Sequence, residues 1–304
     1  MAKQYPFGSD FARWVSTQWL EDHLLDGNLQ ILDCQPDVHD YITEHIPGAI
    51  YVSEGLLRAP LRGLPAQYIP PETMQEIVRH VGLRSDVPIV VYTGSGAFRH
   101  IGDGLEQTMM AYSLARFGHE RVHVLDGGLD KWKQEGRALT KDYPKVQESD
   151  FTVHPHPEYW VTYEEFRALK DRDDVIVLDA RPTAFYEGQG PWSKPGHIPG
   201  AISLPWKSLM ADDNPRLLKP DAEIQALLDS RGIIPGKTII CTCGTGREAT
   251  NEMLLFRCYK GFPQVRIYEG SFTEWCAYPE NPTVTGPNPR EAVAEAAPGA
   301  RMGG

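Results

Sequence analysis

Two cysteines stand one residue apart between an apolar run and a glycine-rich turn, in the stretch TIICTCGTGREATN at residues 238–251. The apolar run predicts a buried strand, and the pattern from Glu248 to Tyr259 predicts a helix. The turn between them would present successive backbone N–H groups, and the helix N-terminus would add partial positive charge. Such a site binds anions and favours a thiolate, so the stretch predicts a nucleophilic cysteine.

The chain of 304 residues contains one internal repeat, in which the order of the motifs is preserved. The sequence HIPGAI begins at His45 and again at His197. The loop TGSG at Thr93 corresponds to CGTG at Cys243. A repeat of about half the chain predicts two homologous domains rather than a solenoid of short units.

The composition of the connecting segments suggests where these domains begin and end. We expect an N-terminal domain over residues 1–140, a Pro-rich and charged surface linker over 141–159, a C-terminal domain over 160–280 and a flexible tail over 281–304. In the C-terminal domain we expect strands at 175–178, 238–241 and 265–268, and helices at 162–170, 221–231 and 248–259. This alternation predicts a parallel sheet covered on both faces, with ligands bound beyond the carboxyl ends of the strands.

Composition excludes several classes of function. The formal net charge of -11 disfavours nucleic acid and anionic membranes as partners. The sequence has no apolar run of membrane-spanning length and no apolar signal-peptide core at its start, so we expect a cytoplasmic protein. Its five cysteines form neither a disulfide framework nor a Cys-x-x-Cys metal array, so we expect reduced thiols and no metal.

Four motifs of the second half together resemble the rhodanese family, specifically its two-domain sulfurtransferases. They are LDAR from Leu178, GHIPGA from Gly196, CGTG from Cys243 and EGSFTEW from Glu269. The resemblance implies an α/β fold of two tandem domains, each a parallel five-stranded sheet with helices on both faces. It also implies an active site in the second domain, whose cysteine takes a sulfur atom from thiosulfate or 3-mercaptopyruvate. The resulting persulfide would pass its sulfur to cyanide or a thiol acceptor.

The resemblance also implies a role for each residue of the site. Cys243 would be the nucleophile, and the persulfide on it would be the only covalent carrier, with no cofactor. The backbone N–H groups of the following residues would hold the persulfide or the departing anion: Gly244, Thr245, Gly246, Arg247 and Glu248. Arg181 would bind the sulfonate or carboxylate oxygens of the donor, for which a guanidinium is suited.

The first domain departs from the family pattern at two positions. Thr93 stands where Cys243 stands, and Gln35 stands where Arg181 stands. The nucleophile and the anion-binding arginine are both missing, which predicts an inactive domain. Its stretch after Gly96 is longer than the counterpart in the second domain, and we expect it to form a wall of the cleft.

Three alternatives remain open at this point. Cys241 and Arg247 have the Cys-x5-Arg spacing of cysteine-dependent phosphatases, some of which share the rhodanese fold, so a phosphatase or arsenate reductase is one alternative. A non-catalytic persulfide carrier that keeps Cys243 is another. The third concerns the sulfur donor, which could be thiosulfate or 3-mercaptopyruvate. We favour thiosulfate because Arg247 and Arg181 together could neutralise two negative charges.

Overall fold

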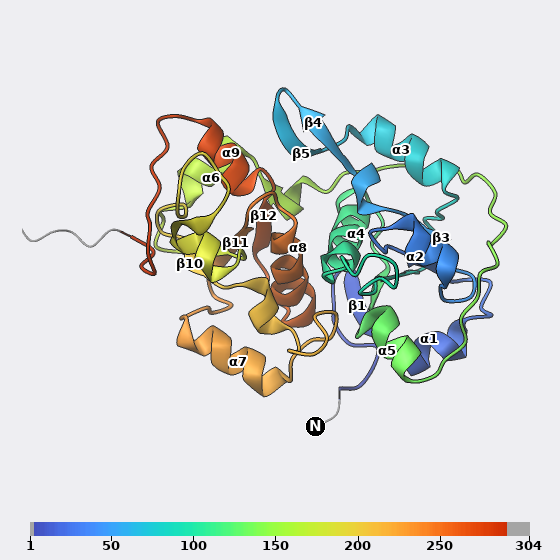
Figure 1. Cartoon of the computed structure of the whole chain (residues 1–304). Helices are drawn as coiled ribbons and strands as arrows, with labels where there is room; N and C mark the ends of the chain where they lie inside the picture. Colours follow the sequence, from blue (N-terminus) through green and yellow to red (C-terminus); the bar gives the residue numbers. More distant parts are fainter. Residues whose placement is uncertain (1–2, 291–304) are drawn as a thin grey trace, which may run out of the picture.

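The computed structural model of the protein describes residues 3–290 and shows one α/β unit from each half of the chain (Figure 1). In the first unit the strands lie in the order β1 (Ala12–Val15), β7 (Val122–Leu125), β6 (Ile89–Tyr92), β2 (Gln30–Asp33) and β3 (Ile50–Tyr51). In the second they lie in the order β8 (Trp160–Val161), β12 (Val265–Tyr268), β11 (Thr238–Thr242), β9 (Val175–Asp179) and β10 (Ile202–Ser203). All neighbouring strands in these two sheets run parallel. The repeat in the sequence is therefore a repeat of topology, and the predicted fold is confirmed.

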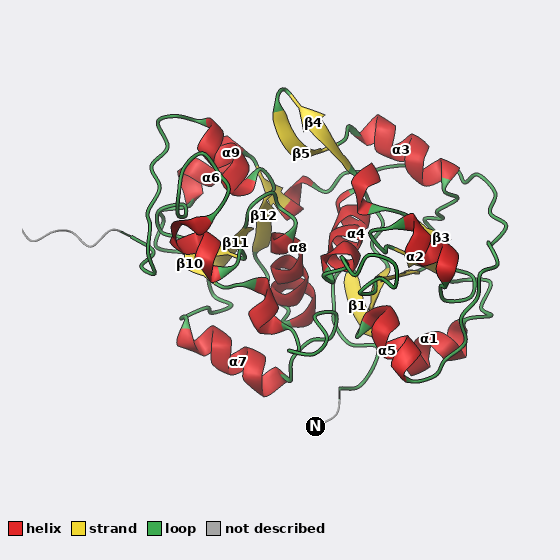
Figure 2. Ribbon diagram, in the orientation of Figure 1, coloured by secondary structure: helices red, strands yellow, loops and turns green. Residues whose placement is uncertain are grey.

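Helices cover both faces of each sheet (Figure 2). In the first unit they are α1 (Thr17–His23), α2 (Val38–Thr43), α3 (Pro71–His80), α4 (Leu105–Arg116) and α5 (Gly128–Gln134). In the second they are α6 (Tyr163–Leu169), α7 (Asp221–Ser230), α8 (Glu248–Met253) and α9 (Ser271–Ala277). Short 3₁₀ helices lie at η1 (Glu54–Leu56), η2 (Pro157–Tyr159) and η4 (Trp206–Leu209), and π-helical turns at η3 (Phe185–Gln189) and η5 (Leu254–Tyr259). A hairpin of β4 (Arg58–Leu61) and β5 (Leu64–Tyr68) extends from the first unit.

The three strands and three helices expected in the second domain are all present within two residues of their predicted bounds. Thr162 and Glu165 form the capping box that their spacing allows, which fixes the start of α6. The helix predicted over 248–259 begins at Glu248, but it changes to a π-helix at Leu254. Such a turn is common at functional sites, and here it directly follows α8, the helix that begins after the loop at Cys243.

The two domains meet along α4 and α8, which lie side by side in the centre of the molecule (Figure 1). All residues of α4 from Leu105 to Ala115 are buried, so this helix has no solvent-facing side. Thr108 Oγ1 lies 3.0 Å from Thr250 Oγ1 across the interface. One cluster of buried apolar side chains runs through both domains and includes Cys243, so the loop that begins at this residue rests on a continuous core.

The start of the predicted tail is ordered, which corrects the expectation that residues 281–304 are flexible. Val284 forms a bridge with His197, and the Gly200 N–H donates to Pro289 O at 2.7 Å. The ring nitrogens of His197 lie 2.9 and 3.1 Å from backbone carbonyls, so this buried histidine is structural, as its apolar turn predicts. The rest of the predicted tail, residues 291–304, lies outside the described residues.

Candidate active site

The loop from Cys243 to Arg247 joins the central strand β11 to α8 at the carboxyl end of the sheet. The Gly246 N–H donates to Cys243 Sγ at 3.1 Å, as expected for an amide cradle. The Cys243 N–H donates to Ser271 Oγ at 3.1 Å, and this hydroxyl lies 3.9 Å from Sγ. Ser271 has a φ of 51°, an unusual value for a residue with a side chain. The sequence analysis did not identify Ser271, although it lies in the EGSFTEW motif.

The environment of the Cys243 thiol differs from the expectation that the loop lowers its pKa. The side chain is fully buried, and this burial raises its pKa well above the usual range. The Glu248 carboxyl beside the thiol raises the pKa further, while the backbone amides of Ala249 and Thr245 oppose the shift. With Cys243 buried in this way, its sulfur is a neutral thiol, because exclusion of water raises the pKa by more than the backbone amides lower it.

Cys241 lies in the strand rather than in the loop. Its Cα is paired with Leu178 on β9 and with Ile267 on β12, and its side chain is fully buried. Burial raises its pKa, and the neighbouring carboxyl of Glu252 raises it further. The surroundings of Cys241 are those of a core residue, as the apolar run predicts.

Arg181 is fully buried and already paired. Its guanidinium forms a two-point ion pair with Asp179, with contacts of 2.9 and 2.6 Å, and Nη2 also donates to Gly196 O at 2.9 Å. It lies 4.0 Å from the ring centroid of Phe272 and 4.9 Å from that of Trp192. Nη1 is buried and has no hydrogen-bond partner among residues 3–290. Only this nitrogen is left to bind a donor. Arg181 therefore cannot bind two oxygens of a donor with two of its nitrogens, as the sequence suggests.

Trp192 covers the start of the loop, and the sequence analysis did not single it out. A Cβ on Gly244 would lie 2.6 Å from Trp192 Cζ2, so only glycine leaves room for the indole. Trp192 Nε1 donates to Thr273 Oγ1 at 2.8 Å, and this hydroxyl donates to Gly244 O at 2.8 Å. Because Cys243 has no exposed surface, a small molecule could reach its sulfur only if side chains around the loop moved.

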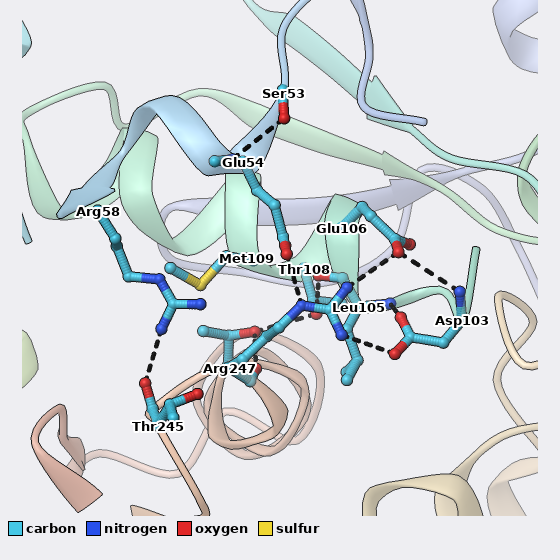
Figure 3. A network of polar contacts seen from close by, with 12 residues as sticks. Ser53, Glu54, Arg58, Asp103, Leu105, Glu106, Thr108, Met109, Thr245 and Arg247 are labelled. Atoms are coloured by element: carbon cyan, nitrogen blue, oxygen red, sulfur yellow. Dashed lines mark hydrogen bonds and ion pairs between the residues drawn. The ribbon is translucent and has the colours of Figure 1, made fainter. Parts of the chain in front are cut away.

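Arg247 points into the domain interface, where it contacts three carboxylates of the first domain (Figure 3). Its Nε lies 2.6 Å from Glu54 Oε1, its Nη1 lies 2.6 Å from Asp103 Oδ2, and its Nη2 lies 2.9 Å from Glu106 Oε1. All three guanidinium nitrogens are therefore engaged by carboxylates of the first domain. The expectation that the Arg247 side chain binds the donor is corrected on this geometry. Asp103 belongs to the longer stretch after Gly96, which we expected to form part of the cleft.

The family model of the rhodanese-like domain matches residues 16–135 and 162–278, which together cover most of the chain. The protein belongs to the rhodanese family. Each matched segment contains four of the five strands of one sheet, and the remaining edge strand, β1 or β8, lies immediately before it, so both halves are rhodanese domains.

Named relatives of the protein include two sulfurtransferases that are named for different donors, and a sulfur carrier protein. A putative thiosulfate sulfurtransferase of Synechococcus elongatus is 34% identical over 91% of this chain and 86% of its own. The 3-mercaptopyruvate sulfurtransferase of Escherichia coli K12 is 29% identical over 88% of this chain and 96% of its own. The sulfur carrier protein TtuD of Thermus thermophilus is 28% identical over 86% of this chain and 92% of its own. The protein is thus a member of the sulfurtransferases, and the names leave its donor unresolved.

Solved structures agree with this assignment. The anaerobic ergothioneine biosynthesis enzyme of Chlorobium limicola, solved with its natural substrate trimethyl histidine, superposes with a TM-score of 0.77. It is 25% identical, and the match covers 90% of this chain and 70% of that enzyme.

In the first rhodanese domain, the counterparts of the site residues lack both chemical groups. Thr93 takes the position of the nucleophile, and its hydroxyl is buried without a partner in the described part of the chain. Gln35 donates from Nε2 to Asp33 Oδ2 at 2.9 Å, in the place of the Arg181 ion pair. Burial raises the pKa of Asp33 to about 6, although hydrogen bonds from Tyr92 and Gln35 oppose this. The domain keeps the carboxyl of the LDAR motif, but the neutral amide of Gln35 takes the place of the Arg181 guanidinium beside it.

No group of side chains suited to a metal ion occurs among residues 3–290. No helix in the same range is long and apolar enough to cross a membrane.

The ionic network around Arg247 shifts the acidities of its members. Burial raises the pKa of Glu106 to about 7, and repulsion from Asp103 adds to the effect. For Asp103, burial acts upward, but hydrogen bonding and attraction to Arg247 outweigh it and lower the pKa. Glu106 is therefore the member that changes protonation near neutral pH.

We expect Glu106→Gln to remove a pH dependence of stability. The pKa of Glu106 is above its ordinary value of 4.5 in the folded protein, so between about pH 4.5 and about pH 7 the unfolded chain binds fewer protons. Stability therefore falls as pH rises through this window, by ~3 kcal/mol in total. The variant should match the parent near pH 4 and exceed it at about pH 8, as measured by urea unfolding. Glu76→Gln, at an exposed position on α3, is the matched control, and parallel pH profiles of parent and Glu106→Gln would contradict the expectation.

Proposed function

We propose that the protein catalyses transfer of a sulfane sulfur from a small anionic donor, through a persulfide on Cys243, to a thiophilic acceptor such as cyanide or a thiol. The observation that carries this proposal is the contact of the Gly246 N–H with Cys243 Sγ at the start of the loop. Cys241, in contrast, lies in the strand and among core side chains. No cofactor other than the persulfide takes part, and the five reduced cysteines fit a cytoplasmic site of action.

The reaction has two displacement steps. In the first, Cys243 loses its proton and the sulfur attacks the outer sulfur of the donor. The bond from that sulfur to the rest of the donor breaks: thiosulfate releases sulfite, and 3-mercaptopyruvate releases the enolate of pyruvate, which takes up the proton to give pyruvate. In the second step the acceptor attacks the outer sulfur of the persulfide, giving thiocyanate or a new persulfide and restoring the Cys243 thiolate. The Glu248 carboxyl lies beside the thiol and is positioned to take the proton in the first step.

The positions of the two arginines change the preferred donor. Thiosulfate is a dianion, and the sequence favoured it because two guanidinium groups could neutralise two charges. Arg247 is held by three carboxylates, and Arg181 is neutralised by Asp179, with Nη1 alone left over. This arrangement favours a monoanion, so we propose 3-mercaptopyruvate as the main donor and thiosulfate as the second.

A phosphatase or arsenate reductase is less well supported by the same geometry. That chemistry needs the cysteine and the arginine of Cys-x5-Arg to face one anion. Cys241 lies within β11, and Arg247 is engaged by the first domain. A non-catalytic persulfide carrier has the support of the TtuD relative, whose name is that of a sulfur carrier. The carrier would keep the persulfide step but would show no multiple turnover with a small donor.

We expect incubation with 3-mercaptopyruvate, and more slowly with thiosulfate, to add the mass of one sulfur atom to the intact protein. Peptide mapping after alkylation of the remaining thiols should place the added sulfur on Cys243, and cyanide should remove it as thiocyanate. Continuous thiocyanate formation distinguishes an enzyme from a carrier. An unmodified protein with both donors, together with hydrolysis of an aryl phosphate, would favour the phosphatase instead.

A further inference from the structure

A short segment of the first domain contacts the sulfur-binding loop of the second on both sides of Gly246. Glu54, at the start of η1, holds the Nε of Arg247 at 2.6 Å. Arg58, at the start of β4, donates from Nη1 to Thr245 O at 2.7 Å (Figure 3). The residues immediately before and after Gly246 are therefore both fixed by the first domain.

The contact of Arg58 lies on the same peptide unit as the hydrogen bond to the sulfur. Thr245 O and the Gly246 N–H belong to one planar trans peptide, so they point in opposite directions. Arg58 binds the oxygen end, and the N–H end donates to Cys243 Sγ at 3.1 Å. A cation on the carbonyl polarises the peptide and strengthens its N–H as a donor, as in other chains of hydrogen bonds.

The backbone at Gly246 is also supported from behind. Its φ of 81° suits glycine, and a Cβ there would lie 2.7 Å from Glu269 O. The Glu269 carboxylate in turn accepts hydrogen bonds from Tyr112 and Arg116 on α4, both at 2.7 Å. The first domain thus contacts this peptide in two ways. Arg58 binds its carbonyl oxygen directly, and α4 holds Glu269, whose backbone lies against Gly246.

We propose that Arg58 is a positioning residue for Cys243, which acts by fixing and polarising the Gly246 N–H that holds the thiolate and persulfide sulfur. The inference rests on the proposed role of Cys243 as the sulfur-carrying nucleophile. It gives the first domain, which lacks a nucleophile of its own, a part in the chemistry of the second. Loss of this contact should slow persulfide formation without preventing donor binding.

The test compares Arg58→Met with Arg58→Lys and with Arg62→Met. Arg62 is exposed at the tip of the same hairpin, so its replacement removes the same charge without touching the loop. The first measurement is the amide proton resonance of Gly246 in protein labelled with ¹⁵N-glycine, with no donor present. We expect an upfield shift in Arg58→Met, a smaller one in Arg58→Lys and none in Arg62→Met, with all three variants unfolding cooperatively.

The second measurement is the kinetics of sulfur transfer. We expect Arg58→Met to lower kcat about 10-fold, less than the loss of a direct donor to a developing charge, with KM for the donor within about twofold. Arg58→Lys should recover at least half of the loss on a logarithmic scale. An unmoved Gly246 resonance in Arg58→Met, or equal losses in the Met and Lys variants, would overturn the proposal. If the parent forms no persulfide, the proposed function fails, while the Gly246 resonance still decides whether Arg58 acts on this peptide.

Discussion

Cys243→Ser should lose sulfur transfer with both donors, by at least about 10³-fold, because a serine hydroxyl is a far weaker nucleophile than a thiolate at neutral pH. The replacement keeps the size of the side chain, and its oxygen can still accept the Gly246 N–H. We therefore expect an unchanged fold and unchanged urea unfolding within about 1 kcal/mol. The measurement is thiocyanate formation from cyanide, with the mass of the protein recorded after exposure to each donor.

Cys241→Ser is the matched control, since Cys241 is equally buried and only two residues away. It should retain sulfur transfer within a few-fold. It should also lose more stability than Cys243→Ser, because its hydroxyl replaces a thiol in the core beside Glu252. Retained activity in Cys243→Ser together with inactivity in Cys241→Ser would reverse the assignment of the nucleophile.

The sequence predicted the loop well because local rules determine it. An apolar β-run, glycines that permit a tight turn, and a helix beginning at Glu248 place Cys243 at the carboxyl end of β11. The internal repeat added a second, independent alignment through Thr93. The strand–turn–helix pattern and the repeated loop each lie within a short window of the sequence. The structure contains the predicted strand, turn and helix, and it places Thr93 at the matching position of the first domain.

The direction of the Arg247 side chain could not be predicted from local sequence rules. Its position next to Gly246 is local, but its direction is set by Glu54, Asp103 and Glu106. These residues lie more than 140 positions earlier in the chain, on η1 and around the start of α4, and they meet Arg247 only where the two domains pack together. No pattern around residue 247 contains that information.

The pKa of Cys243 is likewise determined by residues that are distant in the sequence. The amides of the loop lower its pKa as expected, but the burial that dominates comes from the packing of distant segments. Trp192, which covers Gly244, lies in a Pro- and Gly-rich segment with no periodicity to predict its orientation. A closed loop therefore could not be predicted from the motif alone.

Arg181→Ala should destabilise the protein by about 3–5 kcal/mol, because it leaves the buried Asp179 without its partner. The side chain is fully buried between two aromatic rings, so its loss also removes packing. Urea unfolding measures this effect. Loss of activity in this variant alone would not separate a role in donor binding from a role in folding.

The first domain supplies the variant that separates these two roles. Gln35 donates to Asp33 in the place where Arg181 pairs with Asp179, so Arg181→Gln keeps a hydrogen-bonding partner without the charge. Combining it with Asp179→Asn removes both buried charges, and replacement of a whole ion pair is often neutral for stability. We expect the double variant to unfold within about 1–2 kcal/mol of the parent yet to need at least about 10-fold more donor, because the free Nη1 charge is gone. A stable double variant with an unchanged KM for both donors would show that Arg181 serves the fold and not the donor.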